Sequence, residues 1–212
     1  MQNSKKTRND VTSPRRRGRP PSHDPEQVLK KLCDTFWESG FSGTSLDQLA
    51  GAAGVNRPTL YATFGDKHSM YLAALQHFSA EMRADAGEAL REPQLEIALR
   101  RFYQGAIDRY MNGGKAARGC LVLCTAVSEV PQDSEIRRLL KHVLAEIDDA
   151  LCKRLTEAQN HGQLPTEADP RVLSQMLGAL LHSIALRARA GQSRASLEKL
   201  VSEAVPLLCR QR

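Results

Sequence analysis

The sequence lacks long uninterrupted runs of apolar residues. Its apolar stretches fall far short of the roughly 20 residues that a membrane-spanning helix needs. Near the N-terminus the first apolar residues stand among lysines and arginines, without the continuous apolar segment that a signal peptide carries. These two absences predict a cytoplasmic protein.

The sequence also lacks a cysteine pattern typical of disulfides. The five cysteines are odd in number and widely spaced, an arrangement that suits free thiols in a reducing compartment better than a framework of disulfides: Cys33, Cys120, Cys124, Cys152 and Cys209.

The motifs that usually mark an enzyme are missing as well. We find no glycine-rich loop that would cradle a phosphate, no paired carboxylates in a catalytic context and no nucleophile motif. Pairing Cys120 with His142 or His182 would be arbitrary. A metal site is disfavoured too, because His142 is the only histidine within about 20 residues after Cys124. We therefore expect neither enzyme activity nor a cofactor.

Positive charge is what the sequence does have, and it is concentrated at one end. Residues 1–23 hold seven lysines and arginines against one aspartate, which accounts for the whole net charge of +6. This segment has no hydrophobic periodicity, so we expect a flexible basic arm that attracts a polyanion.

The arm ends in RGRPP at residues 17–21, where two arginines flank a glycine. Such a peptide can lie in the narrow minor groove of A·T-rich DNA, whose negative potential attracts guanidinium groups. We therefore assign Arg17 and Arg19 as DNA contacts. A basic tail that only improves solubility would have the same composition.

Regular structure is predicted from residue 24 onward. Asp24 is placed to cap a helix, Pro25 suits its first position, and Gln27 is placed for a capping box. Apolar residues then recur at helical spacing until Gly40 ends the helix: Val28, Leu29, Leu32, Cys33 and Phe36.

Two short helices follow. The segment 44–47 predicts a second capping box starting at Thr44, and Gly54 is suited to the left-handed conformation that ends this helix. Asn56 then caps a third helix over residues 57–64. Leu60 and Phe64 should face inward, with the remaining side chains outward: Pro58, Thr59, Tyr61 and Ala62.

This arrangement is typical of a helix-turn-helix, whose second helix enters the DNA major groove. A helical hairpin that only packs against its own protein is the alternative. Against it, the outer face of residues 57–64 presents a phenol and a hydroxyl rather than the usual lysine and glutamate mixture.

Three stretches resemble the TetR, or tetracycline-repressor-like, family of transcription regulators: FSGTSLDQLA at 41–50, AGVNRPTLY at 53–61 and FGDK at 64–67. The resemblance is close over about residues 24–72. It implies that Arg57 and Thr59 touch base edges, that Pro58 packs against the groove, and that three side chains contact the DNA backbone: Thr44, Tyr61 and Lys67.

The remainder of the chain predicts an all-α fold of about nine helices. Beyond residue 67, helices are expected at about 67–91, 94–112, 117–129, 134–161, 170–190 and 194–210. We divide the chain into a basic arm (1–23), a helix-turn-helix DNA-binding domain (24–68) and a helical effector-binding and dimerisation domain (69–212). Because residues 24–68 carry a net charge of −2, we expect the arm to supply much of the DNA affinity.

The last two helices are the expected homodimer surface. Each carries a near-heptad apolar stripe, although the same stripes could face only the core of one subunit: Leu173, Leu177, Leu180 and Ile184, then Leu197, Val201, Ala204 and Leu208. The resemblance implies that two subunits build a four-helix interface here.

The resemblance also implies a ligand pocket among the middle helices. The candidate lining residues are Phe102, Tyr103, Tyr110, Cys120, Cys124, Met176 and His182. If Arg118 and a helix N-terminus lowered the pKa of Cys120, this cysteine would be a reactive thiolate. Buried cysteine acting as a small apolar side chain is the more common situation.

Together these features predict a ligand-responsive repressor. It would bind a palindromic operator as a homodimer and leave it when a small-molecule or thiol-reactive effector binds. A DNA-binding architectural protein that does not switch is the alternative, but it would leave the long C-terminal part without a task.

Overall fold

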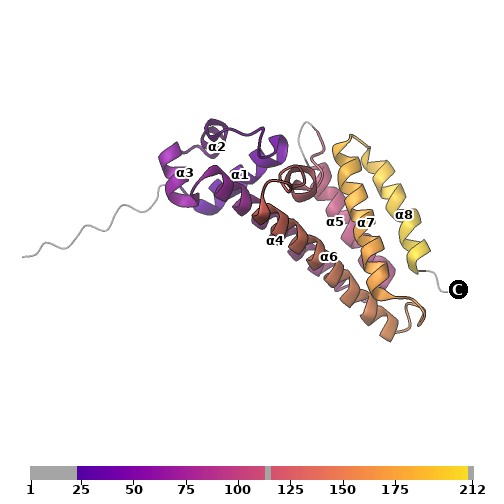
Figure 1. Ribbon diagram of the computed structural model, residues 1–212. Helices are drawn as coiled ribbons and strands as arrows, with labels where there is room; N and C mark the ends of the chain where they lie inside the picture. The colour runs from indigo at the N-terminus through magenta and orange to yellow at the C-terminus, as the bar shows by residue number, and fades with distance from the viewer. Residues whose placement is uncertain (1–22, 113–115, 210–212) are drawn as a thin grey trace, which may run out of the picture.

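The computed structural model describes residues 23–112 and 116–209, and within these every regular element is a helix (Figure 1). The elements, in order, are α1 (Pro25–Ser39), α2 (Leu46–Ala53), α3 (Arg57–Phe64), α4 (Lys67–Leu90), α5 (Leu95–Met111), the π-helical segment η1 (Val122–Ala126), α6 (Ser134–Asn160), α7 (Pro170–Arg189) and α8 (Arg194–Cys209). None of the described helices combines the length and apolar content needed to cross a bilayer.

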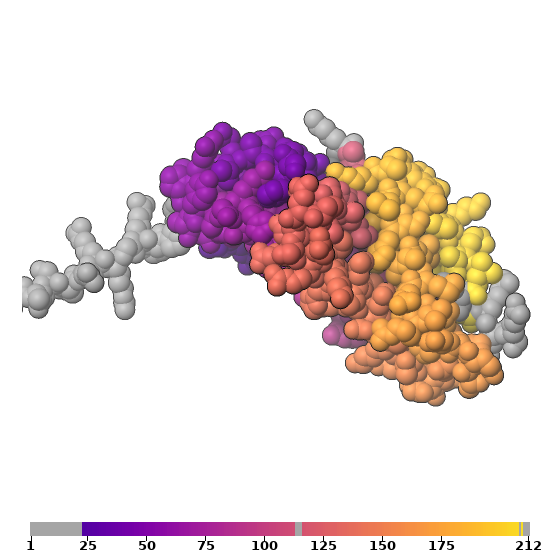
Figure 2. Space-filling view, in the orientation of Figure 1, coloured from indigo at the N-terminus to yellow at the C-terminus, as the bar shows by residue number. Residues whose placement is uncertain are grey.

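Helices α1 to α3 form one end of the molecule, and α6 to α8 lie toward the other (Figures 1 and 2). Asp24 caps α1 by accepting from the Glu26 amide, so Gln27 does not complete the predicted capping box. The box at α2 is present, but one residue later than predicted. Ser45 is the cap, and Gln48 bonds back to its amide at 2.7 Å.

The turn between α2 and α3 fixes the orientation of the third helix. Gly54 adopts φ +67°, a left-handed conformation that costs glycine little, and its amide satisfies carbonyls at the end of α2. Asn56 then caps α3 by accepting from the Thr59 amide at 2.9 Å. Leu60 is fully buried and Phe64 packs against the core, so the inner face of α3 is as predicted.

Helix α4 belongs to both ends of the molecule. Its first half packs against α1, where Tyr71 meets Phe36 and Phe78 meets Trp37 in edge-to-face ring contacts. Its second half is tied to α5, because Arg109 pairs with Glu81 at 2.7 Å. The core therefore runs without interruption from the first helices into the C-terminal bundle.

The predicted helix at 117–129 is wrong for most of its length. The segment contains only η1, a single π-helical stretch from Val122 to Ala126. Within it the buried Thr125 hydroxyl donates to the Leu121 carbonyl at 2.7 Å and also meets the Tyr71 hydroxyl at 2.7 Å. Gly119 lies just before η1 and has φ +65°, a value that does not fit a helix beginning at residue 117.

The apolar stripes predicted as a dimer surface face mainly into the subunit. On α7, Leu177 and Ile184 are buried, and on α8, Leu197 and Val201 are buried. A different face of α7 is exposed, and it carries Val172, Met176 and Leu186, each with half or more of its surface exposed. These four residues therefore face the core of one subunit, which confirms for them the alternative to a dimer surface.

The end of α7 contacts the end of α1. The Arg189 guanidinium donates to the backbone carbonyls of Trp37 and Arg118, at 3.1 and 3.0 Å. The Trp37 indole in turn donates to the Gly119 carbonyl at 2.9 Å. These bonds link the C-terminal bundle directly to the helix that supports α2 and α3.

Candidate nucleic-acid interface and ligand pocket

The outer face of α3 stands clear of the protein. Arg57 and Pro58 are exposed, and Tyr61 keeps 46% of its surface exposed although it is a large aromatic residue. The opposite side of the helix is anchored by Leu60, which is fully buried. The helix is thus held rigidly while its outer side chains face solvent, which is the arrangement that reading a DNA groove requires.

Arg57 is paired with an acidic residue of α2. Its Nε donates to Asp47 Oδ1 at 2.7 Å, and a second guanidinium nitrogen contacts the other carboxylate oxygen. Hydrogen bonding from Arg57 lowers the pKa of Asp47, so the pair is ionised at neutral pH. The guanidinium is therefore held over the outer face in a bidentate geometry.

Thr59 lies deeper than its neighbours on this face. It is half-buried, and its hydroxyl donates to the Asn56 side-chain oxygen at 2.7 Å. That bond fixes the side chain beside the N-terminus of α3.

Two predicted phosphate contacts differ in their surroundings. Thr44 is only 2% exposed, and its hydroxyl donates to the Gly40 carbonyl at 2.6 Å, so this side chain is not available to a phosphate. Lys67, the first residue of α4, holds its ammonium 4.4 Å from the centre of the Phe41 ring and remains partly exposed. Arg17 and Arg19 lie outside the described residues.

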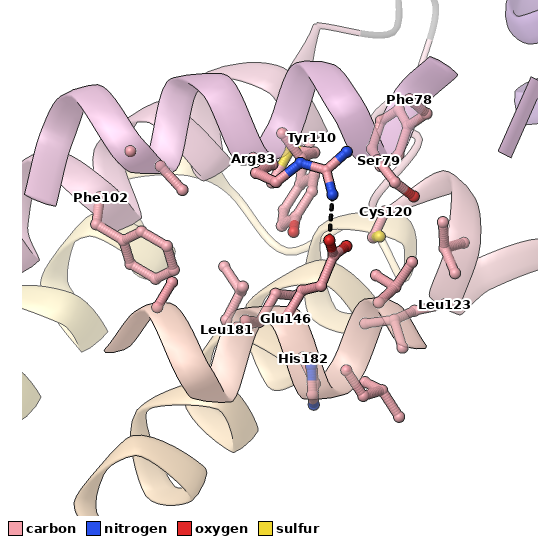
Figure 3. Close-up of a pocket in the computed structure, with 18 residues that line it drawn as sticks. Phe78, Ser79, Arg83, Phe102, Tyr110, Cys120, Leu123, Glu146, Leu181 and His182 are labelled. Carbon is pink, nitrogen blue, oxygen red and sulfur yellow. Dashed lines mark hydrogen bonds and ion pairs between the residues drawn. The ribbon is translucent and has the colours of Figure 1, made fainter. Parts of the chain in front are cut away.

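A cavity of about 160 Å³ lies among α4, α5, η1, α6 and α7 (Figure 3). Its wall is mostly apolar, with Phe78 and Met82 from α4, Leu123 from η1 and Ile147 from α6. A concave, mainly apolar pocket with a few polar groups is the usual form of a small-molecule site.

The structure brings four of the predicted lining residues to this cavity: Phe102, Tyr110, Cys120 and His182. It does not bring the other three. Tyr103 is buried away from the cavity, where its hydroxyl donates to the Leu177 carbonyl at 2.8 Å. Met176 is 51% exposed on the outside of α7. Cys124 lies beside Gly119 and does not contribute to the wall.

Sequence reasoning missed the charged residues of the cavity. Arg83 of α4 and Glu146 of α6 form an ion pair at its wall, and their side chains point toward each other in Figure 3. Each is an ordinary charged residue on an amphipathic helix, so no motif or spacing distinguishes it. Their proximity follows only from the packing of α4 against α6.

Comparison with known proteins decides the family. Residues 28–74 match the model for bacterial regulatory proteins of the tetR family, and residues 97–203 match the tetracyclin repressor-like C-terminal domain. The chain is also 32% identical over 189 residues to the HTH-type transcriptional repressor ComR of Escherichia coli strain K12, covering 87% of each protein. This chain belongs to the TetR family. It is a DNA-binding transcription regulator of the helix-turn-helix type.

Solved TetR regulators share the architecture. CifR, solved as a cysteine mutant with a 26-base-pair double-stranded operator, superposes with a TM-score of 0.81 at 25% identity, covering 89% of this chain and 98% of that one. The reduced form of Escherichia coli NemR superposes with a TM-score of 0.77 at 21% identity, covering 89% and 97%, and shows the shared fold.

Of the two interpretations of Cys120, a reactive thiolate or a buried apolar side chain, the structure of this TetR chain favours the buried one. Burial raises the pKa of Cys120 to about 11, so the thiol stays protonated at neutral pH. Arg118 does not counter this, because it pairs with Asp34 at 2.9 Å and lies over the Trp37 ring. Cys124 is partly exposed; burial raises its pKa as well, opposed by Arg189. Cys120 is therefore the buried, apolar kind of cysteine.

Proposed function

We propose that this regulator is a repressor that binds a palindromic operator as a homodimer and releases it when a small molecule occupies the cavity. The observation that carries the proposal is the exposed outer face of α3, held in place by the buried Leu60. The repressor ComR and the operator-bound CifR support it by their likeness to this chain.

The proposed DNA contacts follow from this face. Arg57 and Thr59 touch base edges, Pro58 packs in the groove, and Tyr61 and Lys67 contact phosphates. Arg17 and Arg19 add the minor-groove contacts expected of a basic arm. Functionally, we keep the division into an arm (1–23), a DNA-binding part (24–68) and an effector and dimer part (69–212), even though one core joins the last two.

The homodimer is proposed to form through the exposed side of α7 together with α8. Val172, Met176 and Leu186 are 50, 51 and 55% exposed along one side of α7, and Leu207 of α8 is 64% exposed. Large apolar residues gathered on one surface mark an interaction site. A two-fold dimer would also place two α3 helices on two half-sites of one operator.

The cavity favours a switching regulator over an architectural DNA protein. An architectural protein needs no apolar cavity, whereas a regulator needs a site whose occupant binds one conformation of the protein more tightly than the other. We propose no catalytic role, and we expect the protein to act in the cytoplasm, where its operator lies.

Selection of bound DNA from a random pool tests the proposal. Full-length protein is expected to return an inverted repeat whose half-sites are separated by whole helical turns of about 34 Å. On that operator, the double variant Thr59→Ala with Tyr61→Ala should lose at least about 30-fold in affinity, measured by fluorescence anisotropy.

Thr156→Ala is the matched control, because Thr156 is an exposed helical threonine of α6 that bonds only to its own helix through the Cys152 carbonyl. A selected pool without two-fold symmetry, or a double variant that binds like Thr156→Ala, would overturn the proposal.

A further inference from the structure

The size of the cavity limits what it can hold. Its volume of about 160 Å³ is close to that of an engineered apolar cavity, about 150 Å³, that holds one benzene molecule in another protein. A single aromatic ring with one small substituent therefore fills the space. Two fused rings would exceed this volume.

The cavity wall disfavours a charged occupant. Phe78, Phe102 and Leu181 are among the apolar side chains that form most of it. Its two ionic side chains, Arg83 and Glu146, already neutralise each other across α4 and α6. An ion entering the cavity would lose its hydration without finding an unpaired charge of opposite sign, so a neutral molecule is favoured.

One polar atom of the wall has no partner. Among the described residues, His182 Nε2 is buried without a hydrogen bond. The other polar groups nearby are engaged, since the Ser79 hydroxyl donates to the Leu75 carbonyl at 2.8 Å and the Tyr110 hydroxyl is paired with the Cys120 thiol. Burial lowers the pKa of His182, against a smaller opposing effect of Asp148, so the ring is neutral at pH 7.

A neutral imidazole nitrogen either donates or accepts a hydrogen bond, depending on the tautomer. A hydroxyl group can meet it in both cases, because it carries a donor and an acceptor. An unpaired buried polar atom destabilises the empty cavity, so an occupant that satisfies it binds more tightly than an apolar molecule of the same size.

We propose that the cavity binds a neutral molecule of one aromatic ring bearing a hydroxyl group, with the hydroxyl bonded to His182 Nε2 and the ring against Phe78, Met82 and Phe102. This inference rests on the proposed function, in which the cavity is the effector site. It adds the chemical class of the effector, a simple phenol.

Calorimetric titration of the full-length protein with four probes tests the class: phenol, toluene, benzoate and 2-naphthol. Phenol is expected to bind more tightly than toluene, which has the same size but no hydroxyl. Benzoate should bind more weakly than phenol because it is charged, and 2-naphthol should bind more weakly because its second ring exceeds the cavity volume. Tighter binding of toluene, benzoate or 2-naphthol than of phenol would overturn the inference.

Replacement of the histidine tests the contact. His182→Phe keeps a ring on α7 but removes the nitrogen, so phenol should lose about tenfold in affinity while toluene is retained or gains. His161→Phe is the control, since His161 is exposed at the C-terminal end of α6, bonds to the Glu157 carbonyl and lies outside the cavity. Equal loss of phenol in both variants would refute the contact.

A measurement on the unmodified protein does not depend on how the variant folds. In protein labelled with ¹⁵N at histidine, phenol should shift the Nε2 resonance of His182 and leave that of His161, which lies outside the cavity, in place. An unmoved His182 resonance at saturating phenol would contradict the proposal.

Operator release is measured separately, by anisotropy of labelled operator DNA in the presence of phenol. If phenol binds at His182 while the operator stays bound, the ligand class stands and the switching function fails. If another molecule releases the operator while phenol does not bind, the function stands and the class fails.

Discussion

At the scale of single residues, the pair of Arg57 and Asp47 is the most informative feature of the DNA face. Both side chains are largely exposed, 51 and 74%, so the pair contributes little to stability. The carboxylate holds the guanidinium in one orientation. If α3 binds DNA as proposed, the pair acts on recognition, and the carboxylate would also place a negative charge next to the DNA backbone.

We predict that Asp47→Asn strengthens binding to all DNA and weakens discrimination. Loss of the carboxylate removes a repulsion from phosphates and frees Arg57 to contact the backbone instead of a base edge. Anisotropy titrations with operator and with random duplex should show higher affinity for both and a ratio between them that falls by about 3 to 10-fold, or about 1 kcal/mol.

The control for this variant is Asp149→Asn. Asp149 forms an equally exposed pair with Arg171, at 2.7 Å, but on α6 and α7, away from α3. If Asp47→Asn and Asp149→Asn change the ratio of operator to random binding equally, Asp47 has no part in specificity.

At the scale of the helices, capping signals predict boundaries well. Helices α4, α6, α7 and α8 begin at their predicted residues, and their ends differ by one residue, because a capping side chain or proline at the start acts within one turn. The segment around η1 was not predictable in this way. Its conformation depends on Thr125 and Tyr71, which lie 54 residues apart and meet only after folding.

Apolar periodicity identifies a helix face but not what covers it. The stripe through Leu177 and Ile184 is regular because it is buried in the subunit core. The exposed side of α7 mixes Val172, Met176 and Leu186 with polar residues, as a surface that also contacts water does, so its pattern in the sequence is weaker. For the same reason, the spacing alone did not show that Met176 points away from the cavity.

Gly119 is a position where the fold requires glycine. Its φ is +65°, and a Cβ there would lie 2.4 Å from the Ala185 carbonyl oxygen of α7 and 2.9 Å from the Cys124 sulfur. We predict that Gly119→Ala lowers the free energy of unfolding by about 2 to 5 kcal/mol, from backbone strain plus the clash. Urea titration followed by circular dichroism, at fixed protein concentration, measures it.

Gly191→Ala separates the two contributions. Gly191 also has a positive φ, +88°, but a Cβ there meets nothing within 4 Å. Gly191→Ala should lower the free energy of unfolding by only about 1 kcal/mol, because it adds backbone strain without a clash. Equal losses in the two variants would show that the contact with α7 does not matter.

At the scale of the whole molecule, helix α7 joins three features. It carries His182 at the cavity, Arg189 on the backbone carbonyls of Trp37 and Arg118, and the exposed apolar side with Met176. A displacement of α7 by an occupant of the cavity would therefore be felt both at α1 and at the proposed dimer surface. This continuity is a property of the packed structure, and the sequence spacing of the three residues does not reveal it.

The dimer surface can be tested through one residue of this helix. Met176→Glu places a charge in the middle of the exposed side of α7, and a buried unpaired charge opposes association strongly. We predict that the dimer dissociation constant rises by about 30-fold or more, measured by sedimentation velocity, and that operator affinity falls because each half-site is then bound independently.

Val127→Glu is the matched control for that experiment. Val127 is 52% exposed, nearly the same as Met176 at 51%, but it follows η1 and lies outside α7 and α8. It should remain a dimer. A Met176→Glu protein that stays dimeric, or a Val127→Glu protein that dissociates as readily, would mean that the two subunits meet on another face, and the spacing of the two α3 helices would then have to be set by different helices.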